Sequence, residues 1–234
     1  MRLAIAALCV LGALAASPAR AGGTTCGETV RLGVDPPSRM DEVVATLRRR
    51  LVAAGEKQPS VERDGAAALR VVLPAGASDS ILTRPAKIEF RLVAKSADEP
   101  GIVAMPRLDG KGTERVEPQI ILDEERLREI RVKQEPNPAG GKPIVAIAFH
   151  IETTGVNNLL TATTEAVGRK LAILVDDRIV ADPVIRAPVA SLTGEISGGF
   201  TLASANELVA LIANGRLRAR VAILGRQAAS CMTH

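Results

Sequence analysis

Aromatic residues are nearly absent from this sequence. Its 234 residues include three phenylalanines and no tryptophan or tyrosine, although 47% of the residues are hydrophobic. The core must therefore be built from aliphatic side chains. Proteins that stack nucleic-acid bases or sugar rings use exposed aromatic side chains, so the composition argues against both of these function classes.

Histidine and cysteine are scarce as well. The two histidines, His150 and His234, restrict catalysis or metal binding that depends on imidazole. The sequence has no His-Glu-x-x-His motif and no cluster of cysteines, so we predict no metal site. It also has no P-loop and no dinucleotide-binding glycine pattern, so we predict no cofactor.

The N-terminal residues predict an export signal. Met1 and Arg2 give a basic start, residues 3–16 form an apolar run, and the small residues Ala19 and Ala21 follow. This is the pattern of a secretory signal peptide, and the run is shorter than the ~20 residues that a membrane-spanning helix needs. We expect a signal peptide at residues 1–21, with an uncleaved N-terminal anchor as the alternative.

Removal of the signal would change the charge of the protein. It would take away Arg2 and Arg20 and no acidic residue, so the formal net charge would fall from +4 to +2. A nearly neutral protein does not suggest a nucleic-acid partner. The longest later apolar segment, 144–151, has only the length of a strand. We therefore predict a periplasmic protein with no membrane span after signal removal.

The hydrophobic pattern predicts a mixture of helices and strands in two blocks. In the first block we expect strands at 28–34, 58–63, 69–73 and 87–94, and a helix that begins at the cap residue Ser38 and ends at Gly55. In the second we expect strands at 144–151 and 217–224, a hairpin at 171–181, and helices at 157–167 and 201–214, the latter capped by Thr201. Between the blocks lies a connector rich in proline and glycine, with a short helix predicted at Asp123–Val132.

The order of these elements predicts an α+β fold. The first block gives strand–helix–strand–strand, and a ferredoxin-like unit then needs one more helix and one more strand. Residues 78–84 are too few to supply that helix, whereas the helix at 201–214 and the strand at 217–224 fit. Both ends of the chain would then form one split domain, with the middle of the chain inserted into it.

One set of segments is familiar as a group: Val145–Phe149, Thr161, 168–176, 181–185, 194–201 and 205–208. Together they resemble the head subdomain of the first periplasmic domain of SecD, the accessory subunit of the Sec translocase. Upstream, 47–51 with Gly55, 71–74 and 88–92 are similar to its base. The resemblance extends over about residues 38–224.

This resemblance implies a ferredoxin-like split base with an inserted α+β head subdomain. The expected parts are a signal peptide (1–21), the first part of the base (22–94), an irregular connector (95–143), the head (144–200), the second part of the base (201–226) and a flexible tail (227–234). SecD itself continues into transmembrane helices on which proton-coupled export depends. This sequence has no such helices, so the resemblance does not imply that activity here.

The function implied by the resemblance is binding rather than catalysis. Its partner would be a polypeptide on the far side of the membrane, or a Sec-type translocase or envelope protein. The contact would use strand addition to a sheet edge or a groove between base and head. Two alternatives remain open. One is an exported enzyme that uses His150 and Glu152 as an acid–base pair, and the other is a structural assembly factor of the cell envelope.

The fold also bears on the two cysteines that follow the signal. In a ferredoxin-like sheet the first and last strands are antiparallel neighbours. Cys26 precedes the first strand and Cys231 follows the last, so we predict a disulfide between them in an oxidising compartment. Two free thiols are the alternative.

Other polar features have structural interpretations. We expect the run Arg48–Arg50 to lie on a solvated helix face, with a site for an anionic partner as the alternative. Ser197 lacks the glycine spacing of a nucleophile elbow, and Asp176 and Asp177 fit a turn. The three phenylalanines are expected in or beside the core: Phe90, Phe149 and Phe200.

Overall fold

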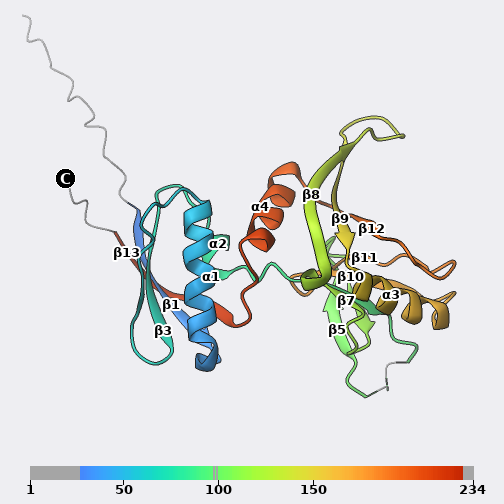
Figure 1. Cartoon of the computed structure of the whole chain (residues 1–234), viewed down its shortest axis with the longest axis horizontal. Helices are drawn as coiled ribbons and strands as arrows, with labels where there is room; N and C mark the ends of the chain where they lie inside the picture. Colours follow the sequence, from blue (N-terminus) through green and yellow to red (C-terminus); the bar gives the residue numbers. More distant parts are fainter. Residues whose placement is uncertain (1–26, 97, 99, 229–234) are drawn as a thin grey trace, which may run out of the picture.

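The computed structural model describes residues 27–96, 98 and 100–228, which form two lobes (Figure 1). We call residues 27–83 and 217–228 the base and residues 88–213 the head. The chain passes from base to head at 84–87, the first crossing, and returns at 214–216, the second crossing. The predicted signal peptide, Cys26 and Cys231 lie outside the described residues.

The base is built on a four-stranded sheet in the order β13-β1-β3-β2. Its strands are β1 (Glu28–Asp35), β2 (Val61–Arg63), β3 (Ala68–Leu73) and β13 (Arg220–Ala228). β1 pairs antiparallel with both β13 and β3. The first and last strands are thus neighbours, as the ferredoxin-like plan predicts, although β13 continues into the predicted tail as far as Ala228.

One face of this sheet is covered by α1 (Met40–Ala53). Its apolar stripe, which includes Val43 and Leu47, is buried against the β1 side chains. The predicted cap, Ser38, lies instead in a short 3-10 turn, η1 (Pro37–Arg39), so no side chain caps α1. A shorter helix, α2 (Ser80–Thr83), packs beside α1 and against β13.

The head contains two sheets and a separate hairpin. The first sheet has the order β11-β10-β4-β7 and consists of β4 (Ile88–Leu92), β7 (Leu122–Asp123), β10 (Leu171–Val175) and β11 (Arg178–Ala181). The second has the order β12-β9-β8 and consists of β8 (Leu127–Glu135), β9 (Ile144–Ile151) and β12 (Thr193–Ser197). The hairpin pairs β5 (Val103–Pro106) with β6 (Thr113–Val116). Two helices complete the head, α3 (Thr153–Glu165) and α4 (Leu202–Ala213).

The helix predicted at Asp123–Val132 is wrong. Residues 124–126 form a 3-10 turn, η2 (Glu124–Arg126), and β8 follows and pairs with β9. Ile130 and Val132 pack against the head core, and such alternation with charged neighbours has the period of a strand. The predicted irregular connector therefore contains the β5–β6 hairpin, β7 and β8.

Helix α4 packs on a different lobe from the one we expected. The sequence assigns 201–214 to the base, yet Ala205, Leu208 and Leu211 are buried in the head core. β4, also expected in the base, pairs with β10 and β7. Helical periodicity shows which face of α4 is apolar but not which sheet covers it, so the sequence could not place this helix.

The predicted cap of α4 and the three phenylalanines lie where the sequence places them. Thr201 caps α4, and its hydroxyl accepts from the Ser204 amide in a reciprocal capping box. Phe90 and Phe149 meet edge to face in the head core, with ring centroids 6.1 Å apart, and Phe200 packs against the same core. Among the described residues, no helix has the length and apolar character to cross a membrane.

Candidate functional site

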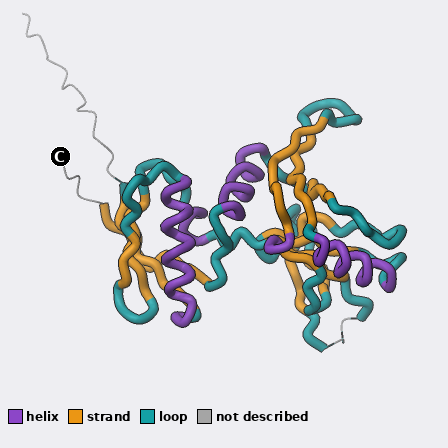
Figure 2. The backbone as a smooth tube through the Cα atoms, in the orientation of Figure 1, coloured by secondary structure: helices purple, strands orange, loops and turns teal. Residues whose placement is uncertain are grey.

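The two crossings run side by side between the lobes and have no regular secondary structure (Figure 2). Where the chain re-enters the base, the amide of Leu217 donates a hydrogen bond of 3.0 Å to the carbonyl of Pro85 on the first crossing. This hydrogen bond joins the two connections between base and head, and polar side chains from both lobes bind to them.

From the base, both crossings are held by Arg50 of α1, which is buried and only 2% exposed. The guanidinium donates five hydrogen bonds, all to backbone carbonyl oxygens. The acceptors are Ile81 (3.2 Å), Arg84 (2.7 Å), Pro85 (3.2 Å) and Gly215 (2.8 and 3.1 Å). Burial lowers the pKa of Arg50 to about 10, so the group remains charged at neutral pH. One cation thus joins α1 to both crossings.

The expectation that the run Arg48–Arg50 lies on a solvated helix face is wrong for Arg50. Arg48 and Arg49 are exposed, whereas Arg50 is not. The sequence contained a signal for this difference, because Arg50 lies three residues after Leu47 and seven after Val43, on the apolar stripe of α1. A charge at a core position of a helix is rarely buried without partners, so this position indicates a contact inside the protein.

From the head, the buried carboxylate of Glu124 binds the second crossing and the first residue of β4. It accepts from the amide of Ile88 at 3.0 Å and from the guanidinium of Arg216 at 2.9 Å. Asp176 adds a second contact, since it accepts from the amide of Lys87 at 2.9 Å and from Arg84 at 2.6 Å. Asp176 lies in the β10–β11 turn, as predicted, where its φ is 48°.

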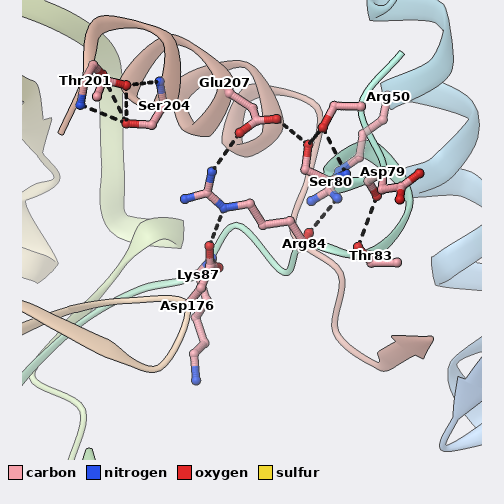
Figure 3. A network of polar contacts seen from close by, with 11 residues as sticks. Arg50, Asp79, Ser80, Thr83, Arg84, Lys87, Asp176, Thr201, Ser204 and Glu207 are labelled. Carbon is pink, nitrogen blue, oxygen red and sulfur yellow. Dashed lines mark hydrogen bonds and ion pairs between the residues drawn. The ribbon is translucent and has the colours of Figure 1, made fainter. Parts of the chain in front are cut away.

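At the rim of the junction, Glu207 of α4 connects the head to the base (Figure 3). Its carboxylate accepts from Arg84 at 3.2 Å and from the hydroxyl of Ser80 on α2. The hydroxyl oxygen of Ser80 also lies 2.9 Å from the hydroxyl oxygen of Ser78, within hydrogen-bond distance. The rim is therefore polar and joins α2, the first crossing and α4.

A cavity of about 240 Å³ opens beside this rim, between α1 and α4; we call it the junction groove. Its apolar lining comes from Ala53, Ala54, Ile81, Ala210 and Leu211, and its polar lining from Arg50, Ser78, Glu207 and Asn214. The small alanine side chains leave the space between the two helices open. The groove offers an apolar floor with hydrogen-bonding groups at its edge.

The predicted acid–base pair is not assembled. His150 is about half exposed, and its Nε2 lies 3.6 Å from a carboxylate oxygen of Glu129. Glu152 forms an ion pair with Arg128 instead. The two side chains do not share a strand face, because β9 ends at Ile151 and Glu152 occupies the cap position of α3. The enzyme hypothesis therefore loses the only pair the sequence offered for it.

Other candidates for chemistry remain separate. Ser197 is the last residue of β12, and Asp177 shares an ion pair with Lys87. Within the part of the chain that the structure describes, no group of three or more histidine, cysteine or acidic residues is placed to hold a metal ion.

Comparison with known proteins relates this geometry to one family. The sequence model of the SecDF P1 head subdomain matches residues 102–219, half of the chain. The chain is 25% identical to the protein translocase subunit SecD of Acetobacter pasteurianus, covering 77% of this chain and 36% of that protein. It is 28% identical to that of Rickettsia bellii, covering 79% of this chain and 37% of that protein. The chain thus spans less than two fifths of the length of these relatives.

A solved structure shares the fold. It is described as that of SecDF, a membrane component that enhances protein export, and it superposes with a TM-score of 0.63 at 18% identity. The match covers 84% of this chain and 98% of that one. A similarity over both lobes agrees with the family match in the head. The α+β architecture and the residues matched together show that the chain belongs to the SecDF P1 head subdomain family.

Proposed function

We propose that this protein is a periplasmic, non-catalytic SecD-like module that binds extended polypeptide and assists protein export. Family membership supports this proposal, as do the relatives named as translocase subunits. The chain corresponds to less than two fifths of those relatives. The proposal therefore takes from them only the binding of polypeptide or of a translocase partner, and not proton-driven transport.

The junction groove is the observation that carries the proposal. Sites for drug-sized ligands usually have about 300–1,000 Å³, whereas this groove has about 240 Å³. It is therefore suited to one or two side chains of a longer molecule rather than to a complete cofactor. An aliphatic side chain would lie on Ala53 and Ala210, and Asn214 and Glu207 at the edge could bind the polypeptide backbone.

Strand addition to the base sheet is a less favourable mode of binding. β13 forms one edge of that sheet, but its pairing with β1 is interrupted by a bulge at Arg31/Leu32. It also carries the charged residues Arg220 and Arg226. Bulges and charges on edge strands are features that discourage pairing with another chain.

A binding titration tests the proposal. A fluorescently labelled, permanently unfolded protein, such as reduced and carboxymethylated lactalbumin, would be titrated with the purified protein and followed by anisotropy. Ala210→Trp fills the groove and should weaken binding by about tenfold or more, since loss of one buried side-chain contact is worth about 1.4 kcal/mol or more. Ala104→Trp, at an exposed position of β5, is the control and should leave binding unchanged.

The outcome distinguishes the proposal from the assembly-factor alternative. If the unmodified protein fails to bind unfolded polypeptide, or if both tryptophan variants bind equally well, the groove is not a polypeptide site. A folded envelope protein that co-purifies with the chain would then favour the structural role.

A further inference from the structure

Helix α3 lies at the end of the head that is remote from the base (Figure 1), and it exposes a row of uncharged polar side chains. These residues follow one another at helical spacing and therefore share one side of the helix. We call them the α3 face: Thr154, Asn157, Asn158 and Thr161, all exposed. We propose that two copies of this chain associate antiparallel through the α3 face.

The composition of α3 is not explained by helix stability. Eight of its thirteen residues are threonine, asparagine or glycine, which form helices less readily than alanine, lysine or glutamate. One of them has a role inside the head, because the hydroxyl of Thr163 accepts from the amide of Val189 at 2.9 Å. Within the described part of the chain, the side chains of Asn157, Asn158 and Thr161 form no hydrogen bond. Their polar groups are therefore available to a partner.

Two opposite charges lie at the two ends of the α3 face. At the beginning of α3, the guanidinium of Arg126 donates a hydrogen bond of 2.7 Å to the hydroxyl of Thr154. At the other end Glu165 is exposed and is the last residue of the helix. Thr154 and Glu165 are about 16 Å apart along the helix axis, at a rise of about 1.5 Å per residue. Arg126, while bound to Thr154, therefore does not reach Glu165.

Both charges are at the unfavourable end of α3. A helix carries partial positive charge at its N-terminus and partial negative charge at its C-terminus, so Arg126 and Glu165 each lie beside a charge of their own sign. Neither forms an ion pair with another described residue. Glu125, next to Arg126, and Arg169, one turn after Glu165, are each engaged in another ion pair. The molecule thus leaves these two charges without a partner.

A second copy in antiparallel orientation provides partners for both charges. In a two-fold dimer the same face of each copy meets the other. Glu165 of one copy then lies beside Arg126 of the second copy and beside the positive end of its helix, and the same contact recurs at the other end. An extended polypeptide could also bind to asparagine side chains, but it would not require opposite charges at the two ends of the face.

The lack of charge between the two ends also fits a second copy. On a two-fold interface, a charged residue near the axis would meet its own counterpart, and like charges placed together are costly. Asparagine both donates and accepts hydrogen bonds, so Asn157 and Asn158 can bind the same residue types in the other copy. The core of a protein interface is typically depleted of charged residues, and the α3 face has this property.

The association would be weak and reversible. One face of a thirteen-residue helix is smaller than the interfaces of stable complexes, which bury about 1,200–2,000 Å² in total. Exposed aliphatic side chains near the two ends, Val167 (52%) and Leu192 (61%), would add apolar contact. We expect a dissociation constant in the micromolar range, and a monomer in the dilute solutions used to measure unfolding.

Sedimentation equilibrium tests the proposal on the full chain without its signal. Reductant would be present, so that no disulfide joins two copies. A reversible monomer–dimer equilibrium should appear as the concentration is raised through the micromolar range. A monomer at every concentration up to the millimolar range would overturn the proposal. Because no polypeptide is present and the junction groove lies elsewhere, the result is independent of the proposed function.

A charge on the α3 face should prevent association. Asn158→Arg brings two like charges together near the two-fold axis, so it should raise the dissociation constant by about tenfold or more. Asn206→Arg makes the same change at an exposed position of another helix, α4, and should leave the dissociation constant unchanged. A dimer that Asn158→Arg does not weaken, or that both variants weaken equally, would overturn the proposal.

Charge reversal tests the antiparallel orientation. Arg126→Glu and Glu165→Arg should each weaken the dimer, because each places like charges together at both ends. The double variant, in which the two charges are exchanged, should restore the dimer, which a general effect on folding would not do. Circular dichroism would show that each variant is folded. A double variant that associates no better than the single variants would contradict the antiparallel pairing.

Discussion

The guanidinium of Arg50 donates two hydrogen bonds to the carbonyl of Gly215, which lies 165 residues later in the chain. Through this contact α1 holds the point at which the chain returns from the head. The same side chain also holds the outgoing crossing. One side chain of the base thus binds both segments that connect it to the head.

Loss of this residue should cost more stability than loss of its neighbour. Arg50→Met leaves buried carbonyls without donors, and a buried hydrogen-bonding group that loses its partner costs about 1–3 kcal/mol. We expect a decrease of about 3 kcal/mol in the free energy of unfolding, measured by urea denaturation. Arg48→Met removes one hydrogen bond to Val61 from an exposed side chain and should cost less than about 1 kcal/mol. Equal losses would show that the buried hydrogen bonds of Arg50 add no stability beyond that of the exposed Arg48 contact.

A methyl group at Gly194 should destabilise the head. A Cβ there would lie 2.6 and 2.7 Å from ring atoms of Phe149, a residue of the head core. Gly194→Ala should therefore lower the free energy of unfolding by about 1–3 kcal/mol, as measured by thermal or urea denaturation. At Gly225 a Cβ meets no atom within 4 Å, so Gly225→Ala should change stability little. An unchanged free energy of unfolding in Gly194→Ala would show that β12 and β9 can move apart at this point without cost.

An ion-pair cluster in the head should make stability depend on pH. Asp182 accepts from Arg107 and from Lys170, each at 2.9 Å, and the hydrogen bond from Arg107 is the main cause that lowers the pKa of its carboxyl. A lowered carboxyl pKa stabilises the folded state above the ordinary value of about 4, and the effect disappears as pH falls through the folded-state pKa.

Asp182→Asn should thus be less stable than the unmodified protein by about 1 kcal/mol at pH 7. The difference should shrink as the pH falls below the ordinary carboxyl pKa of about 4, in urea titrations at each pH. Glu165→Gln, at an exposed position of α3, serves as the control. A difference that stays constant with pH would exclude the ionised carboxylate as its origin.

The disulfide between Cys26 and Cys231 remains a prediction. Glu28 and Ala228 are opposite each other at the end of the β1–β13 ladder. Cys26 shortly precedes Glu28 and Cys231 shortly follows Ala228 in the sequence. Reduction of the exported protein should raise its intact mass by about 2 Da, and closing so long a loop stabilises by roughly 5 kcal/mol at most. An unchanged mass, with both thiols free to alkylation, would refute the bridge.

The sequence predicts the base better than the head. The pairing of β1 with β13 follows from the order of elements in a ferredoxin-like unit, and Gly55 and Thr201 mark helix ends by local chemistry that needs no tertiary context. In contrast, the pairing of β8 with β9 depends on contacts between segments, and the spacing of Leu127 and Ile130 by three residues also fits a helix.

The junction was hidden from sequence analysis for a related reason. Arg50 binds backbone carbonyls, which every residue carries, so no pattern in its partners marks the contact. Glu124 and Glu207 likewise come from segments far from α1 in the sequence. Only the position of Arg50 on an apolar stripe signalled a buried contact, and the groove beside it arises from the packing of α4, which the sequence could not place.

Site-specific photo-crosslinking in cells tests the central claim, polypeptide binding in the junction groove, most directly. A photoreactive phenylalanine analogue at Ala54, in the groove, would be compared with one at Ala104, on β5. Mass spectrometry would identify the captured chains. The account predicts that Ala54 captures unfolded exported polypeptides and that Ala104 does not. Capture of no polypeptide at Ala54, or equal capture at both positions, would contradict it.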